Sequence, residues 1–391
     1  MMSSVTCISD IETLPLLKAA GHISAEDVIA HINVPRHAKS AMDGYAVFSE
    51  DVENASPDSP CVLKVADTID AGDFSDRHFE RGECVRIMTG AFIPDGFDCV
   101  VKQEDTDMGA EYVRIYSRVG RYGNYCPVGE DIREGQIIIG KNMPVTPLMV
   151  GLAASVGIST LKVRRPLRAA VISTGSELAD PCEKVGAGQI YSSIPYILSA
   201  AVSRLGLECI AEKNIPDIPD VMEREFHDAL LGADVLITTG GLSVGRKDLV
   251  RDVLEKINAE IVFDRKSNPL GNPVLFSLAA GKPVLSLSGN PFAAIANFEY
   301  YFMPLVSALM GSDSFMPKTE RAEALNDYTK VRQVRRRVKG FCRNGQVSLF
   351  AEGKNSTISG LSRCNCFVDV ESGDTVRAGD RVQVTYFGGI V

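Results

Sequence analysis

Short apolar runs alternate with amphipathic segments between residues 166 and 313, and this alternation predicts strands and helices in turn. Strands are predicted at 167–173, 209–214, 235–239 and 284–287. Helices are predicted at 194–205, 221–231, 249–256 and 292–309. Strands that are joined through helices run in the same direction, because the crossover returns the chain to the starting edge of the sheet. The region is therefore predicted to be an α/β domain with a parallel sheet.

The regions on either side show different patterns. Residues 11–33 keep a helical spacing of apolar positions, with Ser24 as a second N-cap, so helix is predicted there. Between residues 45 and 146, short apolar runs are interrupted by Gly, Pro and Asp, which is typical of a β-rich domain. A short helix is predicted at 148–156, ended by Gly157. The C-terminal part returns to short strands and turns.

Composition places the chain among ordinary globular proteins. Its 391 residues are 45% hydrophobic and 23% charged, which suits two or three domains, or four if some are small. The net charge of −9 argues against nucleic acid as a partner, because phosphate-binding proteins present a basic face. It also disfavours, at first sight, an anionic substrate. The basic run 332–339 does not change this, since its alternating valines predict the solvated face of a strand.

The sequence gives no sign of a membrane or an export route. No run of about 18 apolar residues occurs, so no membrane partner is predicted. The N-terminus lacks the basic start and apolar block of a signal peptide. Ten scattered cysteines without a CxxC pair predict reduced thiols in a cytoplasmic protein, rather than disulfides or a zinc site.

Three predicted strands of the α/β region end in turns rich in glycine and hydroxyl groups. In open parallel sheets, ligands bind beyond the carboxyl ends of the strands, where glycine permits close approach and helix N-termini offer N–H groups to anions. The glycine spacing matches neither a Walker loop nor a dinucleotide fingerprint. Each turn alone could be structural, but three at one sheet edge predict an anion site. Its candidate residues are Thr174, Gly175, Ser176, Gly240, Gly241, Ser243, Gly245, Ser288, Gly289, Asn290 and Pro291.

Carboxylates accompany these strand ends. Glu177 follows the first turn, Asp217 follows the strand at 209–214, and Asp248 follows the glycine loop. Hard oxygen ligands beside a phosphate site suit Mg²⁺, which needs only one or two carboxylates. Each of the three could instead be a helix cap or a first-turn acid. None of the five histidines lies in a glycine loop, so histidine catalysis is not expected.

Motifs spread over nearly the whole chain resemble those of one family. They are Ser40–Ala46 (SAMDGYA), Arg86–Ala91 (RIMTGA), Gly129–Ile132 (GEDI), Ser173–Leu178 (STGSEL), Gly188–Tyr191 (GQIY), Thr239–Gly245 (TGGLSVG) with Asp248, and Gly289–Pro291 (GNP). Leu361–Ser362 and Asn365–Phe367 fit the last domain of that family. In this order, they resemble the molybdopterin molybdenumtransferase family, of the MoeA and gephyrin E-domain type.

The resemblance implies four domains. They are a split helical linker domain (1–44 and 133–165), a β-rich domain (45–132), an α/β molybdopterin-binding domain (166–313) and a small C-terminal β-barrel (318–391). The implied reaction is molybdenum cofactor biosynthesis, in which molybdate is inserted into adenylylated molybdopterin and AMP is released, with Mg²⁺. A pterin held by backbone N–H groups and Mg²⁺ does not require a basic chain, so the charge of −9 no longer counts against an anionic substrate.

The resemblance also assigns roles to residues. Asp43, Thr89 and Asp131 match family positions that face the cleft from the neighbouring chain of a homodimer, and with Glu177 and Asp248 they are the candidate catalytic residues. Glu177, Asp217 and Asp248 match positions that handle metal or substrate. The partners implied are therefore a second copy of the chain and a small pterin.

Several positions depart from the family pattern. The family usually carries Lys-Pro-Gly-Lys-Pro before the last strand of the α/β domain, whereas residues 267–273 read SNPLGNP with neither lysine, and the nearest cations are Arg265 and Lys266. Ser288 replaces a usual proline, Ile194 a usual asparagine and Cys126 a usual arginine. Three hypotheses follow: an active enzyme with a rearranged oxyanion site, a molybdopterin-binding paralogue that has lost insertion, or a non-enzymatic scaffold.

Overall fold

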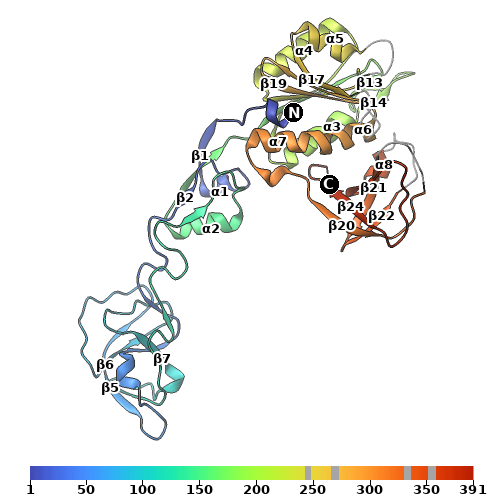
Figure 1. Ribbon diagram of the computed structural model, residues 1–391. Coiled ribbons are helices and arrows are strands. Elements are labelled where there is room, and N and C mark those ends of the chain that lie inside the picture. Colours follow the sequence, from blue (N-terminus) through green and yellow to red (C-terminus); the bar gives the residue numbers. More distant parts are fainter. Residues whose placement is uncertain (243–247, 266–272, 330–335, 351–357, 391) are drawn as a thin grey trace.

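The structure is a computed structural model, and it describes residues 1–242, 248–265, 273–329, 336–350 and 358–390. The molecule is elongated (Figure 1). A β-rich unit lies at one end, an α/β unit and a small barrel lie at the other, and a narrow unit connects them. The domain limits given above stay a prediction.

A six-stranded sheet forms the centre of the α/β unit. Its order is β15 (Glu208–Ile215), β12 (Arg168–Thr174), β16 (Val235–Thr239), β19 (Lys282–Leu287), β18 (Val274–Ala279) and β17 (Glu260–Arg265). The first four strands are parallel, as predicted. The sequence pattern did not predict β18 and β17, which add an antiparallel edge to the sheet.

Helices cover both faces of this sheet. On one face lie α3 (Ile194–Arg204), α6 (Pro291–Asn297) and α7 (Met303–Met310), with a core that includes Leu198, Phe298 and Val306. On the other lie α4 (Pro219–Gly232) and α5 (Leu249–Lys256), with a core that includes Phe226 and Leu254. The predicted helices are confirmed. This doubly covered sheet leaves the carboxyl ends of its strands free to carry a site.

One helical run is long and apolar enough to cross a membrane by length and composition. It is Pro291–Met310, in which a π-helical segment (Phe298–Phe302) joins α6 to α7. Of its most apolar window, 83% is buried inside the protein. The run is therefore a core helix of the α/β unit, and the other described residues contain no further candidate span.

The β-rich unit confirms the pattern of residues 45–146. Its five-stranded sheet has the order β7 (Cys99–Lys102), β4 (Gly44–Val47), β6 (Glu83–Ile87), β5 (Cys61–Ile69) and β8 (Tyr112–Ile115). A smaller pair joins β3 (Lys39–Ser40) to β9 (Tyr125–Cys126). Both β3 and β4 flank the turn at Asp43, so the sheet fixes the position of that carboxylate.

The connecting unit overturns the helix predicted at 11–33. Instead, β1 (Ile11–Pro15) pairs with β11 (Thr160–Arg164), and β2 (Val28–Ile29) pairs with β10 (Ile137–Ile139). Only α1 (Leu16–Ala19) is helical in this stretch, and Leu17 is 86% exposed, so the presumed apolar face is not buried. Pairing with strands far along the chain overrides the local pattern.

Two further predictions hold in the remaining units. The helix expected at 148–156 is α2 (Pro147–Ser155), capped by Thr146 and followed by Gly157 at φ +79°. The C-terminal part forms a closed barrel of β20 (Thr319–Ala324), β22 (Gln346–Leu349), β21 (Arg336–Arg343), β23 (Cys366–Val370) and β24 (Arg381–Tyr386), with α8 (Ile358–Leu361) beside it. The ten cysteines are free thiols.

Candidate functional site

The structure brings the three predicted turns together at the carboxyl edge of the parallel strands. β16 lies between β12 and β19, and their ends are joined by contacts in and beside the turns. The Gly240 N–H donates to the Leu287 carbonyl at 3.2 Å, and the hydroxyls of Ser173 and Thr239 are hydrogen-bonded at 2.5 Å. The Gly175 N–H donates to the Ile215 carbonyl of β15 at 3.1 Å. These hydrogen bonds hold the strand ends and their turns together at this edge of the sheet.

Glycine is required where these turns meet. Gly240 and Gly241 have φ values of +86° and +64°. A Cβ added to Gly240 would lie 2.1 Å from the Thr174 carbonyl oxygen, and one added to Gly289 would lie 3.3 Å from the Gly240 Cα. The buried Thr174 hydroxyl has no hydrogen-bond partner among the described residues. The turns thus pack backbone against backbone beside a buried hydroxyl whose hydrogen-bonding capacity is not used by the described residues.

We expect Gly240→Ala to lower the free energy of unfolding by about 3 kcal/mol, because a Cβ there meets both the left-handed backbone penalty and the Thr174 carbonyl. The matched control is Gly281→Ala, which has φ +77° but nothing within 4 Å of the added Cβ. It should cost only about 1 kcal/mol. Urea denaturation measures both values, and equal losses would show that the contact with Thr174 does not matter.

The turn before α6 uses its own side chains for structure. Asn290 caps α6, since its side-chain oxygen accepts the Ala293 N–H at 3.1 Å. The Ser288 hydroxyl accepts the Asn290 N–H at 3.2 Å. Pro291 occupies the first turn, where a missing N–H costs nothing. Of the residues in this turn that were predicted to bind substrate, Gly289 can therefore contribute only its backbone groups. Ser288 and Asn290 use their side chains to hold the turn in shape.

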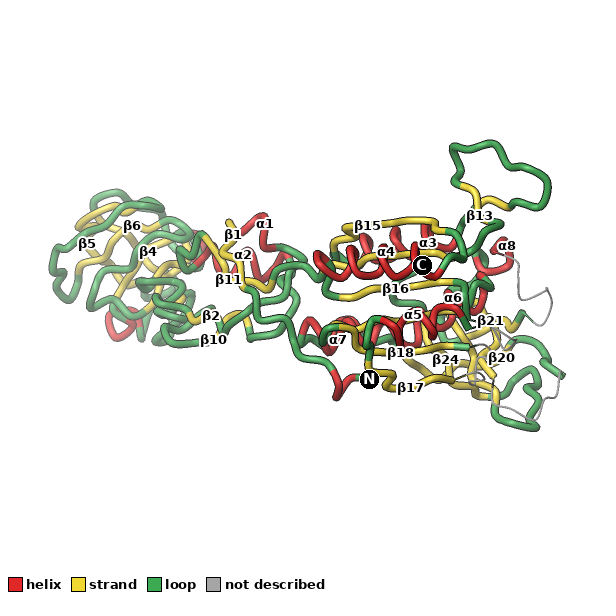
Figure 2. Tube along the Cα trace, turned by 90° about the horizontal axis from the view of Figure 1, so that it is seen from above, coloured by secondary structure: helices red, strands yellow, loops and turns green. Residues whose placement is uncertain are grey.

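The three predicted metal carboxylates differ in their surroundings. Glu177 is exposed before β13 (Leu178–Ala179), whose partner is β14 (Ile190–Tyr191), at the base of a loop that extends away from the sheet (Figure 2). One oxygen of Asp217 is buried without a hydrogen-bond partner in the described part of the chain, and the Asp217 N–H donates to Ser176 Oγ at 3.4 Å. Asp248 holds the N-cap position of α5 but makes no side-chain cap hydrogen bond.

These carboxylates do not form a ready-made metal cluster. Within the described ranges, no group of three His, Cys, Asp or Glu side chains is arranged to hold a metal. A Mg²⁺ ion needs only one or two carboxylates and keeps several waters. Asp217 fits that requirement best, because one of its oxygens has no hydrogen-bond partner among the described residues. Asp248 stays a second candidate, since its side chain makes no hydrogen bond that caps α5.

Some predicted residues lie outside the described ranges. Ser243 and Gly245 belong to these, as do Lys266 and most of the departing segment 267–273. Arg265, the other cation next to this segment, is the last residue of β17.

The remaining catalytic candidates lie in or beside the β-rich unit. One Asp43 oxygen accepts both the Thr89 N–H and the Thr89 hydroxyl at 2.7 Å, and these hydrogen bonds lower the pKa of Asp43. Asp131 is exposed, and its N–H donates to the Val34 carbonyl at 3.0 Å. The β-rich unit, which contains Asp43 and Thr89, and the glycine turns of the α/β unit lie at opposite ends of the molecule (Figure 1), while Asp131 lies at the junction with the connecting unit. A single chain does not bring the two sets together.

The sequence missed a buried cation near the turns. Lys339 on β21 is 7% exposed, and its Nζ lies 5.3 Å from the centre of the Phe292 ring in the first turn of α6. It forms no ion pair with the described residues. The prediction of a solvated strand face for 332–339 is thus wrong at Lys339, because the barrel packs this strand against the α/β unit. Nothing in the local sequence distinguishes this lysine from its basic neighbours.

Comparison with known proteins agrees with this architecture. Residues 1–157 match the family model described as "MoeA N-terminal region (domain I and II)", and residues 170–308 match "Probable molybdopterin binding domain". The chain belongs to the MoeA family of molybdopterin molybdenumtransferases. The family membership that the sequence motifs predicted is therefore confirmed, and the chain is an enzyme of molybdenum cofactor biosynthesis.

Relatives of the MoeA family cover almost all of the chain. The molybdopterin molybdenumtransferase of Staphylococcus aureus (strain Mu50) is 32% identical over 377 residues, which are 95% of this chain and 90% of the relative. That of Staphylococcus epidermidis (strain RP62A) is 31% identical over 94% of this chain and 89% of the relative. The solved MoeA protein of Pyrococcus horikosii superposes with a TM-score of 0.86 at 28% identity, covering 99% and 97% of the two chains.

Proposed function

We propose that this protein inserts molybdate into adenylylated molybdopterin and releases AMP. The observation that carries the proposal is the convergence of three glycine-containing turns beside the unpartnered Thr174 hydroxyl. Such a surface suits a phosphorylated pterin, because backbone N–H groups and a hydroxyl bind anionic oxygens without basic side chains. The substrates are then molybdate and the adenylylated pterin.

We assign the roles of the α/β residues accordingly. Thr174, Gly175, Ser176 and the glycines at 240, 241 and 289 position the phosphate-bearing end of the substrate. Asp217, with its unpartnered oxygen, is the favoured Mg²⁺ ligand, and Glu177 and Asp248 complete the acidic side of the site. A bound Mg²⁺ would neutralise phosphate charge. Lys339 supplies a cation beside the first turn of α6, and the sequence of segment 267–273 lacks the family lysines.

The site requires two chains in this proposal. Asp43 and Thr89 lie in the β-rich unit, at the far end of the molecule from the glycine turns, and Asp131 lies at the junction with the connecting unit, so all three reach a pterin only from a second copy. In a two-fold dimer, such an arrangement yields two equivalent sites, each built from both chains. The ionised Asp43 carboxylate, held by Thr89, then faces the turns of its partner.

Purified protein tests the proposal when it is mixed with adenylylated molybdopterin, Mg²⁺ and molybdate, and AMP is measured over time. We expect AMP release that depends on molybdate. Omission of molybdate is the matched control, since binding is unaffected by it. Binding of the pterin without molybdate-dependent AMP release would contradict the enzyme and support the paralogue that has lost insertion. If the protein did not bind the pterin, the result would support the third hypothesis, a non-enzymatic scaffold.

A further inference from the structure

We propose that a cavity between the α/β unit and the C-terminal barrel binds a small organic carboxylate with an aromatic or branched aliphatic body. The cavity lies away from the glycine turns, and its volume is about 330 Å³. That volume is at the lower end of the range for small-molecule sites. The inference goes beyond the proposed function, because it concerns a second ligand at a second place.

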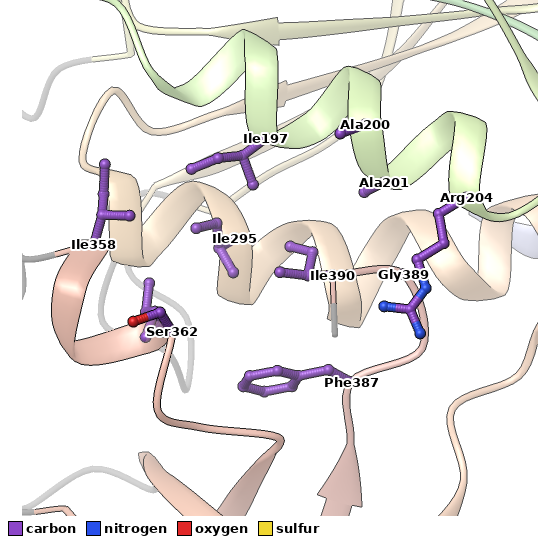
Figure 3. A pocket seen from close by; sticks show the side chains of 11 residues that line it. Ile197, Ala200, Ala201, Arg204, Ile295, Ile358, Ser362, Phe387, Gly389 and Ile390 are labelled. Carbon is purple, nitrogen blue, oxygen red and sulfur yellow. The ribbon is translucent and has the colours of Figure 1, made fainter.

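The walls of this cavity come from four elements (Figure 3). Ile197, Ala200, Ala201 and Arg204 lie at helical spacing along one face of α3, and Ile295 faces them from α6. The rest of the lining comes from α8 and the residue after it (Ile358, Leu361, Ser362) and from the C-terminal tail (Phe387, Gly389, Ile390). Such walls accept an apolar body and leave most polar groups of a ligand without partners.

One cation lies at the end of this apolar cavity. Arg204 extends from the last turn of α3 toward the tail at Gly389 (Figure 3), and it forms no ion pair with the described residues. The Ser362 hydroxyl is already bonded to the Ser359 carbonyl at 3.0 Å. Among the described lining residues, Arg204 is the one with a charged side chain, and a guanidinium binds a carboxylate in a bidentate manner. An apolar body with a single terminal carboxylate matches both features.

The tail that closes the cavity is fixed to the α/β unit. The Glu299 carboxylate accepts N–H groups from Gly388, Gly389 and Ile390 at 2.8, 3.0 and 2.8 Å. A Cβ added to Gly388 would lie 2.7 Å from the Met303 side chain, and one added to Gly389 would lie 3.0 Å from the Phe298 ring. Glycine at both positions therefore lets the tail approach the α/β unit closely. Burial raises the pKa of Glu299, and the nearby Arg204 charge opposes that shift. Because three backbone N–H groups already satisfy the Glu299 carboxylate, the guanidinium N–H groups of Arg204 stay available to a ligand.

A ligand in this cavity would affect the glycine-turn site, because side chains that line the cavity also pack against residues near that site. Ile295 and Phe387 line the cavity and also pack with Phe292 and Phe367 in one cluster. Phe292 is the ring beneath the Lys339 ammonium. Filling the cavity therefore stabilises the arrangement of barrel and α/β unit that places Lys339 beside α6. We expect the carboxylate to raise thermal stability and to modulate turnover.

Isothermal titration of the full-length protein with 3-phenylpropionate tests the proposal. We expect saturable binding with a Kd of about 0.1–1 mM. The neutral amide 3-phenylpropionamide should bind about tenfold more weakly, because it cannot pair with an exposed guanidinium. Absence of saturable binding, or equal binding of acid and amide, would overturn the proposal.

Variants locate the binding. Arg204→Gln should weaken 3-phenylpropionate about tenfold, whereas the matched control Arg168→Gln, on an arginine that pairs with Glu208 and does not line the cavity, should leave binding unchanged. Ala200→Phe places a ring at the cavity and should abolish binding. Circular dichroism melting shows that each variant folds. Retained binding in Ala200→Phe would overturn the site. Pterin-dependent AMP release is measured separately, so failure of one proposal is distinguishable from failure of the other.

Discussion

Asp43→Ala and Asp248→Ala should each lower turnover at least about 10³-fold, and coexpression of the two variants should restore about a quarter of wild-type activity. Random pairing makes half of the dimers mixed. Each mixed dimer holds one site in which the β-rich half and the α/β half are both unmodified. The expectation follows from the separation of Asp43 from the glycine turns within one chain.

Differently tagged chains allow the mixed dimers to be isolated and assayed for AMP release. Asp248→Ala is also followed by urea denaturation, because a loss of roughly 1 kcal/mol or more in the free energy of unfolding would indicate that this N-cap residue serves stability. Dimers of two differently tagged Asp43→Ala chains serve as the control and should stay inactive. If coexpression of the two different variants restored nothing, the site would not be shared between chains.

Lys339→Met should lower turnover by about 10²–10³-fold while raising the free energy of unfolding by about 1 kcal/mol. Both effects have one cause: a buried ammonium that has no ion-pair partner among the described residues destabilises the free protein, and an anionic ligand compensates its charge. Methionine keeps the length of the side chain and its contact with Phe292. Turnover assays and urea denaturation on the same preparation give the two values.

Lys64→Met is the matched control for this lysine. Lys64 is exposed and pairs with Glu83 on the surface of the β-rich unit, so its loss should change neither value by much. Lys339→Arg should retain part of the turnover, because it keeps the charge. Unchanged turnover in Lys339→Met would show that Lys339 packs over Phe292 without contributing to the reaction.

The α/β half of the fold could be predicted because its pattern is local. Each parallel strand is a short apolar run followed by a helix of clear period, and the runs at 235–239 and 249–256 coincide with β16 and α5. β17 and β18 escaped prediction, because an antiparallel edge has no connecting helix to frame it. The glycine turns were found from the same pattern, since they lie where the strands end.

Other features depend on contacts that the local sequence does not contain. The segment 11–33 has a helical rhythm, yet Ile11–Pro15 forms a strand because Thr160–Arg164 is available to pair with it. Lys339 resembles its basic neighbours until the barrel packs against Phe292. The distance between Asp43 and the glycine turns also follows only from the assembled units.

The connecting unit has a consequence for how such a chain arises. The chain leaves it at Val34 and returns at Ile132, and these two residues are paired: the Val34 N–H donates to the Ile132 carbonyl at 2.7 Å. The whole β-rich unit is thus an insertion with adjacent ends. A single in-frame genetic event at this junction could add or remove it without disturbing the rest of the fold, and a short linker across the pair would give a chain that lacks the β-rich unit.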